Sequence, residues 1–255
     1  MIKSNAMPNS HSLSKTGMGL FAATLAAAAL VCTIHNARAE TAVMIPPPAA
    51  AVTAGIPANP AAQDTAVFAG GCFWGIQAVF QHTRGVLNAV SGYAGGAKEN
   101  AEYGKVSSGN TGHAESVQVS FDPQQISYGK LLQIYFSVAH DPTQLNRQYP
   151  DSGTQYRSAV FYKDAAQKQI AERYIAQLDN THLYHAKIVT QLSPLTAFYA
   201  AEKYHQDYAT LHPESGYIAH FDLPKIANLK KLYPDLYRET PVLVASQASG
   251  MAKTK

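Results

Sequence analysis

Cysteine, tryptophan and charge are all scarce in this sequence. Of its 255 residues two are cysteine, one is tryptophan and 15% are charged. Two cysteines cannot build the disulfide framework that holds many small secreted domains together. No loop ends in the Gly-Lys-Ser/Thr of a phosphate-binding loop, and no Gly-x-Gly-x-x-Gly follows an expected strand, so nothing supports nucleotide binding. The sequence also lacks an internal repeat, which argues against a solenoid.

The first 39 residues have the pattern of a secretory signal. Two lysines precede an uncharged apolar run, residues 17–34, and the small-x-small site Ala37-Arg38-Ala39 follows it. We therefore predict a signal peptide over residues 1–39 and an exported protein, either periplasmic or secreted. Because the apolar run is long for a signal, an N-terminal membrane anchor is the alternative.

Without the predicted signal the chain is formally neutral. Residues 1–39 hold three of the 20 basic residues and none of the 17 acidic ones. The remaining chain has no excess of positive charge that would attract nucleic acid or an anionic membrane. We expect neither as a partner, and we expect a monomer.

Composition divides the rest of the chain into three parts. Residues 40–63 are rich in alanine and proline and nearly uncharged, which predicts a linker without a core. Residues 64–238 are expected to form one domain, long enough for a single core. Residues 239–255 end in small and basic residues and are predicted to be a flexible tail.

Hydrophobic periodicity predicts strands and helices in mixed order through the domain. The expected strands cover residues 65–69, 85–90, 115–122, 156–162 and 187–192. The expected helices follow Cys72 and cover residues 128–139, 164–180, 200–211 and 225–232. This order indicates an α+β fold, a mixed sheet with packed helices.

The most informative stretch is Gly70-Gly71-Cys72-Phe73-Trp74-Gly75, between the first expected strand and the helix after it. Paired glycines permit backbone conformations and close approaches that other residues cannot make. Cys72 is expected at the N-terminus of that helix, where unpaired N–H groups commonly lower the pKa of a thiol from ~8.5 toward 7. The stretch predicts a reactive thiolate, and the alternative is an inert core cysteine.

A reactive thiol needs a bound electrophile and a proton donor. Phe73 and Trp74 offer an apolar wall for a small hydrophobic group. A carboxyl such as Glu115, at the start of an expected strand, can give a proton to a leaving oxygen, and tyrosine hydroxyls can hold that oxygen. A sulfoxide combines an apolar methyl group, a polar oxygen and an electrophilic sulfur, and it fits this description.

Several histidines leave other interpretations open. His113 or His140 could act as the base for Cys72, as in a cysteine hydrolase. His205 and His212 could share a helix face, but no third residue has the spacing of a metal ligand, and we expect no metal. A further alternative is a secreted module that only binds methionine-rich partners through its aromatic pocket.

Four motifs, taken in order, resemble the A-type peptide methionine sulfoxide reductases. They are Gly71-Cys72-Phe73-Trp74-Gly75, Gly112-His113-Ala114-Glu115, His140-Asp141-Pro142-Thr143-Gln144 and Gly153-Thr154-Gln155-Tyr156-Arg157-Ser158. The resemblance covers residues 65–238. It implies an α/β roll with a ferredoxin-like core, no bound cofactor, and reduction of the S epimer of free or protein-bound methionine sulfoxide.

The resemblance also implies a role for each matching residue. Cys72 would attack the sulfoxide sulfur and become a sulfenic acid, and Glu115 would give a proton to the oxygen. Tyr103 and Tyr156 would hydrogen-bond that oxygen, and Asp151 would be an acid associated with the site. The two aromatic residues after Cys72 would line the methyl pocket. With an export signal, this activity predicts repair of oxidised exported proteins.

Two features depart from the family pattern. Many members carry resolving cysteines near the C-terminus, whereas here Tyr217-Ile218 stands at that place and no cysteine follows Cys72. We therefore expect an external thiol, either a thioredoxin-like protein or a small thiol, to resolve the sulfenic acid. Tyr149 stands before Pro150-Asp151, where the family more often has glycine, and is expected to narrow that loop.

Overall fold

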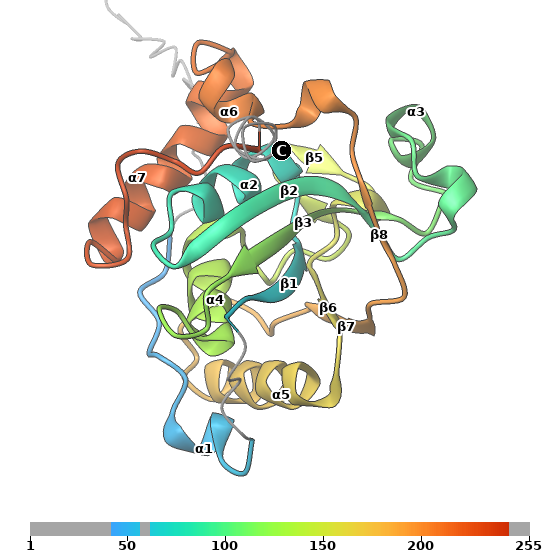
Figure 1. Cartoon of the computed structure of the whole chain (residues 1–255). Helices are drawn as coiled ribbons and strands as arrows, with labels where there is room; N and C mark the ends of the chain where they lie inside the picture. Colours follow the sequence, from blue (N-terminus) through green and yellow to red (C-terminus); the bar gives the residue numbers. More distant parts are fainter. Residues whose placement is uncertain (1–41, 57–61, 245–255) are drawn as a thin grey trace, which may run out of the picture. The chain divides into compact units, whose positions relative to one another are not determined.

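The computed structural model describes residues 42–56 and 62–244, which are drawn in colour in Figure 1. The predicted signal peptide or anchor, part of the predicted linker and most of the predicted tail lie outside the described residues. Within the described ranges, no helix has the length and apolar character needed to span a membrane.

A six-stranded sheet organises the fold, in the order β7-β6-β1-β3-β2-β8 (Figure 1). Its strands are β1 (Asp64–Ala69), β2 (Val86–Ala94), β3 (Ala114–Phe121), β6 (Ala159–Tyr162), β7 (Gln191–Pro194) and β8 (Phe198–Ala200). β6 and β7 are parallel, and the other neighbouring pairs are antiparallel. A separate pair joins β4 (Arg147–Gln148) to β5 (Asp151–Ser152). The predicted α+β fold with a mixed sheet is confirmed.

Helices pack on the sheet and lead into the loops of the candidate site. They are α2 (Phe73–Gln81), α3 (Tyr103–Val106), α4 (Tyr128–Ile134), α5 (Ala165–Asp179), α6 (Tyr208–Leu211) and α7 (Leu223–Leu232). Ser127 and Asp164 cap α4 and α5 by accepting backbone N–H groups of the first turn. α4 continues into the wider turn η2 (Tyr135–Ala139), so a helix over residues 128–139 is confirmed.

Alternation along β1 decides which of its side chains meet the helices. Ala66 and Phe68 belong to the main core, whereas Val67 and Ala69 belong to a smaller cluster. Phe68 stacks on Phe80 of α2, with ring centroids 5.2 Å apart. Because side chains alternate between the two faces of a strand, the large aromatic residue of β1 packs against the helix that begins after Cys72.

The predicted helix over residues 200–211 is wrong. The segment holds the end of β8, the 3-10 turn η4 (Lys203–His205) and the one-turn helix α6. Asp207 separates them with a φ of 60°, a left-handed conformation that interrupts a helix. Its carboxylate accepts from Gln81 and its backbone N–H donates to Gln77, so contacts with α2 hold this conformation. The expected strand at residues 187–192 begins later, as β7.

The predicted linker is also wrong for its described part. Residues 42–56 pack on the domain, with Ile45 and Val52 in the main core. The backbone carbonyl of Ile45 accepts a hydrogen bond from the side chain of Gln133 in α4 at 2.9 Å. The carbonyl of Pro46 accepts one from the hydroxyl of Tyr174 in α5 at 2.7 Å. The short helix α1 (Ala50–Thr53) contacts α5. A low content of charged residues is typical of a linker of this composition. It also makes burial of a segment less costly, and residues 42–56 pack against the domain through the buried Ile45 and Val52.

The start of the predicted tail packs as well. The backbone N–H of Val242 donates to the carbonyl of Gln81 at 3.1 Å, and that of Val244 donates to Asp207 at 3.0 Å. The flexible-tail prediction is therefore wrong for residues 239–244, because the apolar Val242 lies against the main core. Residues 245–255 lie outside the described part.

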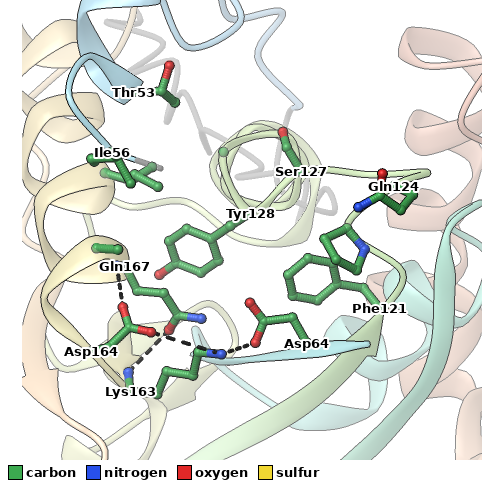
Figure 2. Close-up of a pocket in the computed structure, with 14 residues that line it drawn as sticks. Thr53, Ile56, Asp64, Phe121, Gln124, Ser127, Tyr128, Lys163, Asp164 and Gln167 are labelled. Carbon is green, nitrogen blue, oxygen red and sulfur yellow. Dashed lines mark hydrogen bonds and ion pairs between the residues drawn. The ribbon is translucent and has the colours of Figure 1, made fainter. Parts of the chain in front are cut away.

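A cavity of about 710 Å³ lies among α1, α4 and α5 (Figure 2). Tyr128, Gln167 and the ion pair of Lys163 with Asp64 line it. None of its 14 lining residues belongs to the four sequence motifs. We therefore assign this cavity no part in the predicted chemistry.

Candidate active site

Two glycines let the chain turn closely against neighbouring loops before Cys72. Gly71 has a φ of +96°, a conformation that residues with a side chain rarely adopt. A Cβ on Gly70 would lie 2.7 Å from the ring of His140, and one on Gly71 would lie 2.6 Å from Gln148. The turn therefore requires glycine at both positions, and it places Cys72 at the N-cap of α2 as predicted.

Cys72 is nearly covered, with 9% of its surface exposed. Burial, followed by the charges of Glu115 and Asp222, raises the pKa of the thiol well above its ordinary value, although the backbone N–H of Trp74 lowers it. The lowered pKa expected at a helix N-terminus is therefore wrong for this structure. Loss of water and two nearby carboxyl groups outweigh one N–H donor, and Cys72 is a neutral thiol at neutral pH.

Glu115 lies near the start of β3 and is 2% exposed. Its Oε2 accepts the backbone N–H of Phe73 at 3.1 Å, which ties the carboxyl to the residue after Cys72. Burial, with smaller contributions from Asp151 and Asp222, raises the pKa of this carboxyl to about 8. Glu115 therefore keeps its proton at neutral pH, as a general acid must.

Two tyrosines interact electrostatically with both Glu115 and Cys72. Tyr103 begins α3, Tyr156 ends the 3-10 turn η3 (Thr154–Tyr156), and both side chains are half-buried. Burial and then the charge of Glu115 raise the pKa of each phenol, and Cys72 contributes to both. The structure thus brings the thiol, the carboxyl and two protonated hydroxyls within electrostatic reach of one another.

Asp151, in β5, brings a second carboxyl to the site. It is half-buried, and its Oδ2 accepts a hydrogen bond from the hydroxyl of Tyr217. Burial raises the pKa of Asp151, while this hydrogen bond and the charge of Lys225 lower it. The sequence marks Tyr217 only as the place of an absent cysteine. Its role escapes sequence reasoning because the two partners are 66 residues apart.

The aromatic pair after Cys72 consists of a buried and an accessible member. Phe73 is 1% exposed, and its ring centroid lies 5.0 Å from that of His205. Trp74 is half-buried, stacks on Tyr208 at 3.9 Å and meets Tyr217 edge-on at 6.0 Å. Trp74, Tyr208 and Tyr217 therefore supply apolar surface next to the thiol, and Phe73 supports this surface from the interior.

An ion pair lies against the first turn of α2, and the sequence motifs do not include it. Asp222 is fully buried and accepts from Nζ of Lys225 at 3.3 Å. A Cβ on Gly75 would collide with Oδ1 of Asp222, so glycine there allows the pair to approach the helix. The carboxylate of Asp222 contributes to the raised pKa values of both Cys72 and Glu115.

The two histidines near the motifs are structural. The ring nitrogens of His140 bond to the carbonyl of Tyr135 at 3.1 Å and to the hydroxyl of Ser158 at 2.7 Å, and burial lowers its pKa to about 3. The ring nitrogens of His113 bond to the backbone of Gly96 and Ala97. Neither ring is free to accept a proton from Cys72, which contradicts the cysteine-hydrolase alternative.

The metal interpretation of His205 and His212 also finds no support. His205 packs between the rings of Phe73 and Tyr103, at 5.0 and 4.5 Å. His212 lies 3.8 Å from the carboxylate of the exposed Glu214. Among the residues that the structure describes, no three His, Cys, Asp or Glu side chains form a group that could hold a metal ion.

Comparisons with known proteins point to one family. The peptide methionine sulfoxide reductase family matches residues 64–235. The peptide methionine sulfoxide reductase MsrA 2 of Mesorhizobium japonicum is 61% identical over 186 residues, which are 73% of this chain and 95% of that protein. The MsrA of Deinococcus radiodurans is 49% identical over 178 residues, which are 70% of this chain and 86% of that protein.

Solved structures of such reductases have the same fold. Reduced Mxr1 from Saccharomyces cerevisiae superposes with a TM-score of 0.54 at 33% identity, covering 64% of this chain and 92% of that chain. Methionine sulfoxide reductase A of Corynebacterium diphtheriae superposes with a TM-score of 0.52 at 33% identity, covering 68% of this chain and 85% of that chain. The chain is thus similar to this group in sequence and in fold.

Proposed function

The chain belongs to the peptide methionine sulfoxide reductase family and is an oxidoreductase that reduces methionine sulfoxide, and we propose that it does so with Cys72 on the S epimer. The observation that carries this proposal is the pairing of Cys72 with Glu115. The carboxyl is buried, hydrogen-bonded to the N–H of the next residue, and protonated at neutral pH because its pKa is about 8. A neutral acid beside a nearly covered thiol suits transfer of oxygen between two sulfur atoms.

The substrate sulfoxide binds between the aromatic and the polar side of the site. Its methyl group packs against Trp74, and its oxygen accepts hydrogen bonds from Tyr103, Tyr156 and Glu115. A sulfoxide sulfur is a stereocentre, so fixing the methyl group, the oxygen and the main chain at three places selects one epimer. Asp151, held by Tyr217, bounds the same pocket.

The proposed reaction keeps every proton within the site. The sulfur of Cys72 attacks the sulfoxide sulfur while Glu115 gives its proton to the sulfoxide oxygen. The new bond between the two sulfur atoms and the sulfur–oxygen bond of the substrate then both break as the hydroxyl passes to the sulfur of Cys72, and the electron pair of the sulfur–sulfur bond stays on the substrate sulfur. The proton of the thiol returns to Glu115. The products are a thioether and a sulfenic acid on Cys72, so the substrate sulfur gains the two electrons that Cys72 loses.

An external thiol then regenerates the enzyme. The chain has cysteines only at positions 32 and 72, and position 32 belongs to the predicted signal. A thioredoxin-like protein or a small thiol condenses with the sulfenic acid, which releases water and forms a mixed disulfide. A second thiol attacks that disulfide and frees Cys72. No bound cofactor takes part in this sequence of steps.

The predicted signal peptide sets the proposed location. With residues 1–39 removed, the enzyme would act as a periplasmic or secreted monomer that repairs oxidised exported proteins and also accepts free methionine sulfoxide. Residues 64–238 form its reductase domain, and the packed segment at residues 42–56 extends that domain at its N-terminal side.

Turnover on separated epimers tests the proposal. With dithiothreitol as the reductant, the wild type is expected to reduce only the S epimer of N-acetyl-methionine sulfoxide, and Cys72→Ser is expected to reduce neither. After one turnover without reductant, a sulfenate-specific probe should label Cys72 alone. Equal rates on the two epimers, or residual turnover in Cys72→Ser, would contradict the proposal.

A further inference from the structure

We infer that Tyr149 and Phe221, here called the apolar rim, bind the side chain next to an oxidised methionine in a polypeptide substrate. The inference rests on the proposed function and concerns the substrate class that the same site prefers. Tyr149 is 51% exposed, and its ring meets that of Phe221 at a centroid distance of 5.9 Å. The sequence motifs leave its role unexplained.

A continuous row of rings joins the apolar rim to the catalytic pocket. Trp74 and Tyr217 have ring centroids 6.0 Å apart, and Tyr217 and Phe221 have centroids 5.1 Å apart. Phe221 and Tyr149 follow at 5.9 Å. Trp74, Tyr217 and Phe221 are half-buried, and Tyr149 at the end of the row is exposed. The apolar surface of the methyl pocket therefore continues outward to the open surface.

Two hydrogen bonds hold the apolar rim in place. The hydroxyl of Tyr217 donates to Asp151, two residues after Tyr149, which ties the loop to the turn η5 (Ile218–Asp222) that carries Phe221. The backbone N–H of Tyr149 donates to Oε1 of Gln144 at 3.1 Å. A surface that is already ordered loses little conformational freedom when a ligand binds, so its contacts contribute to affinity.

The position of the rim identifies its occupant. Phe221 lies two centroid steps from Trp74, of 6.0 and 5.1 Å, and Tyr149 lies a further 5.9 Å along the row. Successive Cα atoms of a polypeptide lie only ~3.8 Å apart, so a long side chain that flanks the bound methionine sulfoxide is needed to extend along the row to the rim. The chemistry of this side chain should be apolar, because the rim is aromatic and the carboxyl of Asp151, hydrogen-bonded to Tyr217 of the same row, disfavours an acidic neighbour. Free methionine sulfoxide has no neighbouring side chain and cannot use this surface.

Capped pentapeptides with a central methionine S-sulfoxide test the inference, with dithiothreitol as the reductant. For the wild type, kcat/KM should be about tenfold higher with leucine than with serine on both sides of the sulfoxide, because leucine removes apolar area of the rim from water. In Tyr149→Ser this leucine-to-serine ratio should fall to about twofold or less. Tyr149→Phe keeps the ring and should keep the wild-type ratio.

Leu183→Ser is the matched control, because Leu183 is also an exposed apolar residue, at 46%, and has no place in the row of rings. It should keep the wild-type ratio. A ratio near one in the wild type, or a wild-type ratio in Tyr149→Ser, would overturn the inference. A loss in Tyr149→Ser seen only with thioredoxin as the reductant would also overturn it, since the rim would then serve the reductant. Failure to reduce N-acetyl-methionine S-sulfoxide would instead count against the proposed function.

Discussion

Two polar clusters adjoin the turn at Gly70-Gly71, and they differ in how their hydrogen bonds are satisfied. The reactive cluster consists of Cys72, Tyr103, Glu115 and Tyr156. The structural cluster consists of Tyr135, His140, Ser158 and Thr190. In the structural cluster, the hydroxyl of Ser158 lies 2.7 Å from His140, 2.7 Å from Thr190 and 3.0 Å from Tyr135. In the reactive cluster, one N–H donor at 3.1 Å reaches the carboxyl of Glu115.

The difference shows what separates a polar core from a site that can react. Burial moves pKa values in both clusters: it lowers the pKa of His140 to about 3 and raises that of Glu115 to about 8. His140 is fully hydrogen-bonded and only supports the glycine turn. Glu115 stays protonated with capacity for a further partner, and a sulfoxide oxygen can take that place.

The strongest way to break this comparison is Glu115→Gln. Glutamine has the same shape and its side-chain oxygen can still accept the N–H of Phe73, but it cannot give a proton to the oxygen. We expect kcat/KM for N-acetyl-methionine S-sulfoxide to fall by about 10²–10⁴-fold. Steady-state kinetics with dithiothreitol measures this. A loss smaller than about threefold would remove Glu115 from the role of acid.

The pH profile provides the next test. Because the pKa of Glu115 is about 8, kcat/KM should be level below that pH and fall above it by roughly tenfold per pH unit. Glu115→Gln should lose this alkaline decline. An increase of wild-type activity through pH 9 would instead indicate that ionisation of the thiol limits the reaction.

The free energy of unfolding should decrease as the pH rises, because the pKa of Glu115 is higher in the folded than in the unfolded protein. The folded protein keeps a proton on Glu115 that the unfolded chain releases, since the ordinary pKa of 4.5 is raised to about 8. The contribution to the free energy of unfolding is present below the ordinary pKa and is lost as the pH rises through the folded value. Denaturant unfolding of the wild type and of Glu115→Gln, compared between these two pH values, isolates it.

The smallest effect on activity is expected at the centre of the structural cluster. Ser158→Ala leaves His140, Tyr135 and Thr190 each without one hydrogen bond, so the free energy of unfolding should fall by about 1–3 kcal/mol. The change in kcat/KM should be less than about threefold, since no reacting group is touched. Urea unfolding and steady-state kinetics measure the two effects. A large loss of activity with unchanged stability would show that the two clusters are not separate.

Local patterns predicted much of the fold and the position of Cys72 at the start of a helix, whereas Tyr103 and Tyr156 were predicted only from the family resemblance. The alternation at residues 115–122 and the glycines around Cys72 follow from single elements, and the structure has β3 and the N-cap where they were expected. The helix expected at 200–211 fails because long-range contacts hold Asp207 in a left-handed conformation. Hydrophobic periodicity within one segment cannot predict contacts with a distant segment.

Contacts between distant parts of the chain account for what the sequence did not predict in the site. Tyr217 meets Asp151, and the pair of Asp222 and Lys225 meets Gly75 of α2. The raised pKa of Cys72 also depends on contacts between distant parts of the chain. The sequence shows only the helix N-terminus, which favours the thiolate, whereas the folded structure adds the burial and the carboxyl groups that raise the pKa.

The shallow exposure of Cys72 also bears on damage by peroxide. A sulfenic acid becomes irreversibly overoxidised when its sulfur attacks a peroxide molecule, and this requires an open approach to the sulfur. With 9% of Cys72 exposed, that approach is narrow. In the proposed reaction the sulfenic acid persists until an external thiol reaches it, because residues 64–238 contain no second cysteine. Burial of Cys72 therefore limits the access of peroxide to its sulfur.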